Sequence, residues 1–186
     1  MTKPDPDYAP HIRLAHADDD DFILSIAERL VGFDLPSWRK RSETLAGIRA
    51  DIARHLRELP AASHLFVAEV EVGDSRPRAS HGGRAEDAPR TASGEVTERV
   101  GFLHLQTQKD FFTGVLNCHI ADLVVASQHD GEGVGSALVA FAESWAREHR
   151  CRHMTLAVFP GNKRARILYE RHGYGDELIR MTKPLR

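Results

Sequence analysis

The sequence has few cysteines, little net charge and no long hydrophobic run, and each scarcity excludes a class of protein. Its only cysteines are Cys118 and Cys151, too few for the disulfide framework of a secreted domain, so we expect two buried or free thiols. A formal net charge of −2 argues against coating nucleic acid, which needs a strongly basic face. The longest uncharged stretch, 111–121, is far below the ~18 residues of a membrane span. No apolar targeting segment follows Met1. We therefore expect a cytoplasmic, soluble protein with neither a nucleic-acid nor a membrane partner.

The length and the charge distribution give the first positive indications. With 186 residues, of which 41% are hydrophobic and 28% charged, the chain fits one domain that buries its own core. Residues 1–31 carry seven acidic and three basic side chains, whereas 147–186 carry ten basic and four acidic ones. An anionic ligand is therefore expected to bind in the C-terminal fifth of the chain.

Hydrophobic periodicity predicts a mixed α/β domain. An aspartate run at 18–21 is expected to complement the dipole of the first helix, with a patch for a cationic substrate as the alternative. A hairpin of two long strands ends in the apolar run 120–125, which is typical of a central strand. Strands are expected at 11–14, 64–72, 96–107, 114–125, 153–159 and 177–182, and helices at 18–30, 42–59, 136–150 and 162–171.

The segment 73–95 differs from the rest of the chain. Between Gly73 and Gly94 it contains four glycines, two prolines and no large apolar residue, so it cannot bury enough apolar area to offset the cost of ordering. We predict a long polar loop that joins two strands of one sheet. A role in gating the substrate site stays open.

A glycine turn connects the central strand to the third helix. The sequence Asp130-Gly-Glu-Gly-Val-Gly135 places glycines at a helix N-terminus, where unpaired N–H groups and the helix dipole favour an anion. The turn lacks the lysine of a phosphate-binding P-loop and the G-x-G-x-x-G spacing of a dinucleotide-binding fold. A tight turn that only allows close helix packing is the alternative.

A second motif follows one strand later. Asn162, Ala165 and Tyr169 lie at helical spacing, and Gly173-Tyr174 follows the helix end. Together the two motifs resemble those of the GNAT superfamily of acyl-CoA-dependent N-acetyltransferases. The resemblance is closest over 120–174, and the upstream strand order extends it to most of the chain. It implies one domain over 1–186, with a central, mostly antiparallel twisted sheet whose fourth and fifth strands splay apart, flanked by helices.

The resemblance also implies a cosubstrate, acetyl-CoA, and no metal. Its pyrophosphate would lie on the amides of the glycine turn, and its pantetheine arm would lie along the end of the fourth strand, where a backbone N–H would polarise the thioester. A solvated surface is the alternative for the basic side chains of the last helix. The predicted cofactor-binding residues are Leu123, Val124, Val125, Asp130, Gly131, Gly133, Val134, Gly135, Ser136, Asn162, Lys163, Arg164 and Arg166.

One residue of the turn departs from the family pattern. Asp130 stands where the family has arginine or glutamine, and a carboxylate beside a pyrophosphate is electrostatically unfavourable. An alternative register begins at Gln128. We prefer the first register because Val134 and Leu138 then occupy the apolar positions of the motif.

The resemblance assigns Tyr169 as the general acid that protonates the leaving thiolate, with a packed aromatic as the alternative. An alkylamine, with a pKa near ~10, arrives mostly protonated, so a base must remove its proton. Ala121 stands where many family members have a glutamate. The neighbouring Asp122 and His119 are the candidate bases, and a water chain or another residue is the alternative.

The leading prediction is an acetyltransferase that acts on a small amine or a peptide, by direct attack in a ternary complex. The acidic N-terminal segment favours a cationic acceptor. Because family members are often dimers, a homodimer is one open arrangement. The main alternative is a non-catalytic acyl-CoA-binding or regulatory module on the same fold. A nucleotide-binding oxidoreductase is a more distant alternative.

Overall fold

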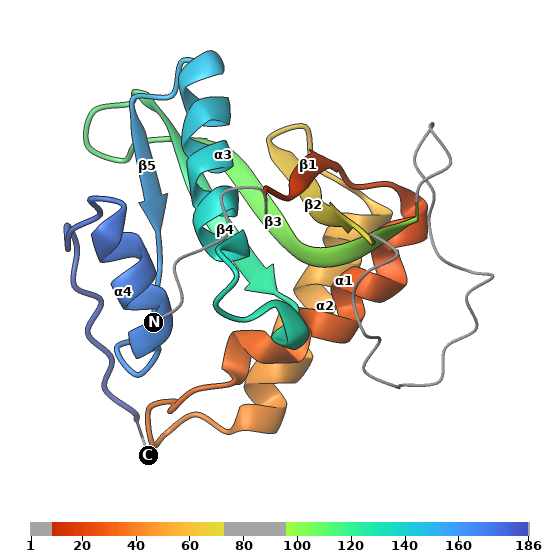
Figure 1. The fold of residues 1–186 in the computed structure, drawn as a ribbon. Coiled ribbons are helices and arrows are strands. Elements are labelled where there is room, and N and C mark those ends of the chain that lie inside the picture. The colour runs from red at the N-terminus through yellow and green to blue at the C-terminus, as the bar shows by residue number, and fades with distance from the viewer. Residues whose placement is uncertain (1–8, 73–95, 186) are drawn as a thin grey trace.

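One five-stranded sheet organises the molecule (Figure 1). The computed structural model describes residues 9–72 and 96–185; the predicted loop at 73–95 lies outside the described residues. The strands lie side by side in chain order, antiparallel except for the parallel last pair. This confirms the predicted mixed α/β fold. The strands are β1 (His11–Leu14), β2 (Ser63–Glu71), β3 (Thr97–Lys109), β4 (Leu116–Val125) and β5 (His153–Leu156).

Helices cover both faces of the sheet, because neighbouring strand residues point to opposite sides. Phe102 of β3 packs with Ile23 and Ile52 from the first two helices, whereas the adjacent Leu103 shares a core with Leu138 of the third. One face carries α1 (Asp20–Ile26), the 3₁₀ helix η2 (Ala27–Val31) and α2 (Arg41–Arg57). The other carries α3 (Val134–Glu148), with α4 (Lys163–Arg171) beside it.

The aspartate run is more than a dipole complement. Asp18 and Asp19 lie in the short 3₁₀ helix Ala17–Asp19, and the next two aspartates open α1. Asp19, however, is fully buried between the guanidinium groups of Arg13 at 2.7 Å and Arg99 at 2.6 Å. Although burial opposes it, hydrogen bonds from Arg13 and from a backbone amide lower the pKa of Asp19. This residue therefore ties β1 and β3 to the first helical segment.

Strand β4 contains a β-bulge. His104 of β3 lies opposite Asp122, whereas Leu105 lies opposite Ile120, so Ala121 has no partner on β3. In a regular strand, residues 119 and 122 point to opposite faces. The extra residue changes that, and both side chains lie on the face covered by α2.

Strands β4 and β5 pair over a short length and then diverge. Pairing joins Asn117–Ile120 only to His153–Leu156, although β4 continues to Val125. The predicted splay of the fourth and fifth strands is confirmed. The expected extension of β5 to residue 159 is wrong, because the chain beyond Leu156 has lost its neighbouring strand.

The expected closing strand at 177–182 is also wrong. The segment has no regular secondary structure, and the side chains of Leu178, Ile179 and Met181 are exposed. Alternating apolar residues form a strand only where a sheet edge pairs with them, and the short β5 does not pair with this segment.

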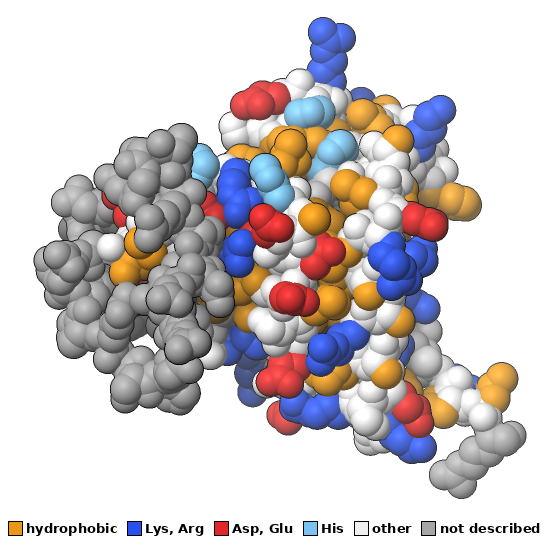
Figure 2. All heavy atoms as spheres, turned by 90° about the vertical axis from the view of Figure 1, so that its right-hand side faces the viewer, with side chains coloured by type: hydrophobic (Ala, Val, Ile, Leu, Met, Phe, Trp, Pro, Cys, Tyr) orange, Lys and Arg blue, Asp and Glu red, His pale blue; other side chains and the backbone are white. Residues whose placement is uncertain are grey.

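The surface carries both charge signs intermingled on the face shown in Figure 2. Neither sign dominates there, in keeping with the small net charge. No helix within residues 9–72 and 96–185 combines the length and hydropathy needed to cross a membrane. The two cysteines are free thiols, with Cys118 buried.

Candidate active site

The glycine turn has the conformation that an anion site requires. Gly131 and Gly133 have positive φ angles of 88° and 93°, which side-chain-bearing residues rarely adopt. Gly133 is the N-cap of α3, so the N–H groups of the first helical turn have no intrahelical partner. Gly135 serves packing instead, since a Cβ there would lie 3.3 Å from Leu168 of α4. The packing role of the turn is thus observed at Gly135, and anion binding stays a prediction that the conformation of Gly131 and Gly133 allows.

The edge of β4 next to this turn has no strand partner among the described residues beyond Ile120. Leu123, Val124 and Val125 pair with β3 on one side only. Their other edge is the place where an extended ligand arm could add to the sheet. The predicted backbone site is therefore geometrically available.

Helix α4 brings basic side chains towards the turn. Its N-cap, Asn162, accepts a hydrogen bond from the amide of Ala165 at 3.2 Å, so its carbonyl oxygen caps the helix and its side-chain NH₂ remains for a ligand. Arg166 pairs with Glu170 and Asp176 at 3.6 and 3.7 Å. It therefore lies apart from Lys163 and Arg164.

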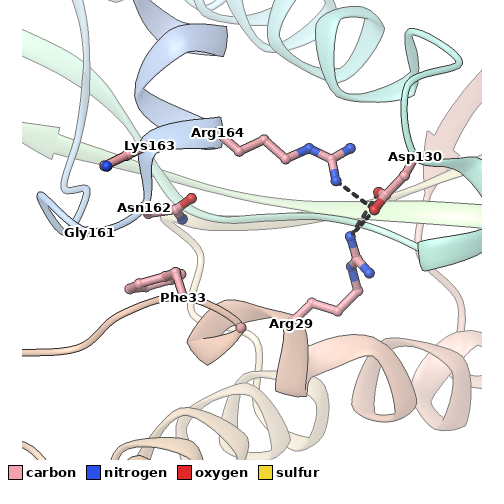
Figure 3. A pocket seen from close by; sticks show the side chains of 8 residues that line it. Arg29, Phe33, Asp130, Gly161, Asn162, Lys163 and Arg164 are labelled. Carbon is pink, nitrogen blue, oxygen red and sulfur yellow. Dashed lines mark hydrogen bonds and ion pairs between the residues drawn. The ribbon is translucent and has the colours of Figure 1, made fainter.

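A pocket of about 440 Å³ lies between the loop after η2, the glycine turn and the start of α4. Arg29 and Arg164 reach into it from two sides, while Lys163 points away from Asp130 (Figure 3). The lining residues are Arg29, Gly32, Phe33, Asp130, Gly161, Asn162, Lys163 and Arg164.

Asp130 is clamped by two guanidinium groups. Nη2 of Arg29 lies 2.8 Å from both carboxylate oxygens, and Nη1 of Arg164 lies 2.5 Å from Oδ2. Burial alone would raise the pKa of Asp130, but hydrogen bonds from Arg164 and Arg29 lower it. The carboxylate is thus held in ion pairs, although its side chain stays 33% exposed. Arg29, 101 residues away in the chain, was not predicted and brings a positive charge to the turn.

Tyr169 of α4 lies near Asp122. Burial, and next the charge of Asp122, raise the pKa of the Tyr169 phenol to about 12. The ring packs against Tyr174 at a centroid distance of 5.6 Å. The phenol therefore holds its proton at neutral pH, as a general acid must.

The two candidate bases lie on the same face of β4. His119 has Nδ1 2.9 Å from the hydroxyl of Thr155; burial lowers its pKa, although the charge of Asp122 opposes this. Asp122 has Oδ2 3.1 Å from Nδ1 of His104, with side chains 15% and 1% exposed. The sequence did not predict a role for His104, because nothing in its own strand indicates that its side chain pairs with a carboxylate.

A family model, the acetyltransferase (GNAT) family, matches residues 51–174. The chain belongs to the GNAT acetyltransferase family. This match spans both motifs and the two candidate bases. No match is found among curated proteins.

Solved structures share the GNAT fold at low sequence identity. A protein from Pyrococcus furiosus described as an acetyl transferase has a TM-score of 0.63 and 19% identity, over 94% of this chain and 100% of that one. A ribosomal-protein-alanine N-acetyltransferase from Brucella melitensis has a TM-score of 0.61 and 16% identity, over 95% and 100%. A transcriptional regulator from Bacillus halodurans has a TM-score of 0.59 and 19% identity, over 94% and 99%. At these identities the likeness shows the fold alone.

In this GNAT domain the predicted site residues fall into two groups. The turn residues, Asn162, Lys163 and Arg164 surround the pocket or adjoin it, while Asp122 and His119 flank the bulge. Tyr169 packs against the core on the α3 side, close enough to Asp122 for that charge to raise the pKa of the phenol. Ser136 turns its hydroxyl to Nε2 of His172 at 2.7 Å. Within the described residues, no group of three or more His, Cys, Asp or Glu side chains is placed to hold a metal.

Proposed function

We propose that this chain transfers an acetyl group from acetyl-CoA to an amine by direct attack. The observation that carries the proposal is the arrangement along β4. A carboxylate lies beside the bulge with a protonated phenol near enough to feel its charge, and a glycine turn with basic side chains lies just beyond the strand end. One end suits proton transfer and the other suits phosphates.

The residues of the turn fit the cosubstrate. The left-handed glycines open the first-turn amides of α3 to phosphate oxygens, and Arg164 and Lys163 supply positive charge. The free edge of β4 would hold the pantetheine arm, and a backbone N–H there would donate to the thioester oxygen. Acetyl-CoA would supply an acetyl group activated as a thioester, and the thiolate of coenzyme A would be the leaving group.

The proton transfers then fall to side chains at the bulge. Asp122 attracts the ammonium form of the acceptor and takes one proton from it, which leaves the lone pair that attacks the carbonyl carbon. As the new C–N bond forms and the C–S bond breaks, Tyr169 gives its proton to the sulfur. The nitrogen then loses its second proton, which returns to the Tyr169 phenolate, and Asp122 releases its own proton to solvent. His119 is the alternative base, since it shares the face of Asp122 and its lowered pKa favours the neutral imidazole.

Tyr169→Phe tests the general acid. We expect turnover to fall by about 10²-fold or more, because the leaving thiolate loses its proton donor. Acetyl-CoA binding should change little. Release of free thiol from acetyl-CoA with a panel of amines measures turnover, and calorimetry measures binding.

Tyr174→Phe is the matched control, since its ring touches that of Tyr169 but its hydroxyl has no assigned role. Equal losses in both variants would contradict an acid role for Tyr169. If the wild type binds acetyl-CoA but acetylates no amine, the alternative of a non-catalytic binding module holds. The absence of glutamate at Ala121 and the occupied charges around Asp130 favour that alternative.

A further inference from the structure

A buried polar cluster lies behind the proposed base. His104 of β3 is 1% exposed and His55 of α2 is 6% exposed, and their rings meet at a centroid distance of 4.7 Å. Gln106, two residues along β3, lies between the outer nitrogens of the two rings. None of these residues belongs to the motifs that identify the family.

The contact with Asp122 determines that Nδ1 of the His104 ring carries a hydrogen. Its Nδ1 lies 3.1 Å from the carboxylate Oδ2 of Asp122. A carboxylate only accepts hydrogen bonds, so Nδ1 must carry the hydrogen and donate. In a neutral imidazole, Nε2 of His104 is then an acceptor.

Gln106 supplies the donor for that acceptor. Its Nε2 lies 3.4 Å from Nε2 of His104 and 3.5 Å from Nε2 of His55. An amide NH₂ has two hydrogens, so one group can serve both rings. His55 in turn directs Nδ1 at the backbone carbonyl of Asp51 at 2.9 Å, where Nδ1–H donates. Both rings are satisfied as neutral Nδ1–H tautomers.

The opposite amide orientation is unfavourable. If Gln106 presented its oxygen, both rings would need hydrogen on Nε2 as well as on Nδ1. They would then be two imidazolium cations in contact inside the protein, and such burial of like charges is costly. The other titratable groups around the two rings are His119 on β4, His64 on β2 and Asp51 on α2, whose Oδ2 lies 3.4 Å from Nδ1 of His55. Asp122 and the 48% exposed Asp51 are the negative charges that face the rings, and the two contacting cations would still repel each other.

We infer that His104 is a positioning residue for Asp122, and that Gln106 fixes it as the neutral Nδ1–H donor. One carboxylate oxygen is thereby held, and the other is left for the proton of the amine. This inference rests on the proposed function, in which Asp122 acts as the base. It adds two residues, His104 and Gln106, whose effect on the reaction is exerted only through Asp122.

Nitrogen-15 NMR of the full chain tests the tautomer without any activity. We expect His104 and His55 to show protonated Nδ1 and unprotonated Nε2 at pH 7, with His104→Asn and His55→Asn providing the assignments. An imidazolium or an Nε2–H tautomer at His104 would overturn the inference. Gln106→Glu, which can only accept, should convert His104 to the imidazolium; an unchanged spectrum would also overturn it.

The pH profile of kcat/KM tests the positioning. His104→Leu removes the donor to Asp122, so we expect the acidic limb to move upward by about 1 pH unit. His104→Asn keeps an N–H where Nδ1 was and should retain the wild-type limb. His153→Leu is the control for loss of a histidine near the strand, because His153 begins β5 and lies opposite Asn117, at the other end of β4 from Asp122.

Two outcomes would defeat the positioning role: a wild-type profile in His104→Leu, or equal shifts in the leucine and asparagine variants. Wild-type protein that acetylates no amine would instead defeat the proposed function. The NMR result would still decide the state of His104, so the two failures are distinguishable.

Discussion

Two aspartates of this domain, Asp122 and Asp130, are held in opposite ways. Asp130 is about 33% exposed and is clamped by two permanent cations, Arg29 and Arg164. Asp122 is 15% exposed and receives a hydrogen bond from an imidazole that is almost fully buried. Guanidinium groups can stay charged at the partly exposed turn, whereas the buried cluster of His104 and His55 next to β4 favours a neutral donor. The first arrangement gathers two cations at the turn but occupies them with a carboxylate, whereas the second leaves one carboxylate oxygen without a histidine partner.

The largest expected effect comes from Asp122→Asn. The amide cannot take a proton from the amine, so we expect kcat/KM to fall by about 10²-fold or more. The dissociation constant of acetyl-CoA should stay within about twofold, since Asp122 lies away from the glycine turn. Thiol release and calorimetry measure the two quantities.

His119→Gln separates the alternative base from Asp122. We expect a smaller loss than in Asp122→Asn, because glutamine keeps a polar partner for Thr155. A larger loss in His119→Gln would transfer the base role to His119.

A smaller and opposite effect is expected from Asp130→Asn. Loss of the carboxylate releases Arg29 and Arg164 towards phosphates, so acetyl-CoA should bind about threefold to tenfold more tightly, in the range of a partly exposed ion pair. The gain should shrink at high salt, because exposed charges are screened. Titrations at low and high ionic strength measure it, with Glu148→Gln as a distant charge control. Weaker binding of acetyl-CoA by the variant would instead show that Asp130 holds Arg29 and Arg164 in the positions that the pocket needs.

The smallest expected effect concerns stability against acid. The pKa of Asp130 is lowered by its arginines, against the effect of burial, so its stabilising contribution is present above the ordinary aspartate value of about 3.9 and is lost as the pH falls through the lowered value. The urea midpoints of wild type and Asp130→Asn should therefore differ most near pH 7 and converge as the pH falls through the lowered pKa of Asp130. A difference that is constant with pH would show that the ion pairs contribute nothing.

The sequence predicted those features that depend on local pattern. The glycine turn and the helix that starts near Asn162 were expected, because glycines in a turn and an asparagine before a helix are visible in the sequence itself. Arg29 could not be expected at Asp130, because only the contact of η2 with β4 brings them together. The bulge at Ala121 was equally hidden, since one unpaired residue hardly disturbs an apolar run. It is nevertheless the reason why His119 and Asp122 share a face.

The edge of β4 beyond Ile120, which has no strand partner within the described part of the chain, also has a consequence for handling the protein. Unpaired backbone groups on a strand are a template on which another chain can assemble, and Leu178, Ile179 and Met181 add exposed apolar side chains elsewhere on the surface. A ligand arm laid along β4 would cover that edge as a neighbouring strand does. Purified protein should therefore self-associate more in plain buffer than with coenzyme A present. The rate at which it aggregates in storage would then show how far a ligand covers the edge of β4.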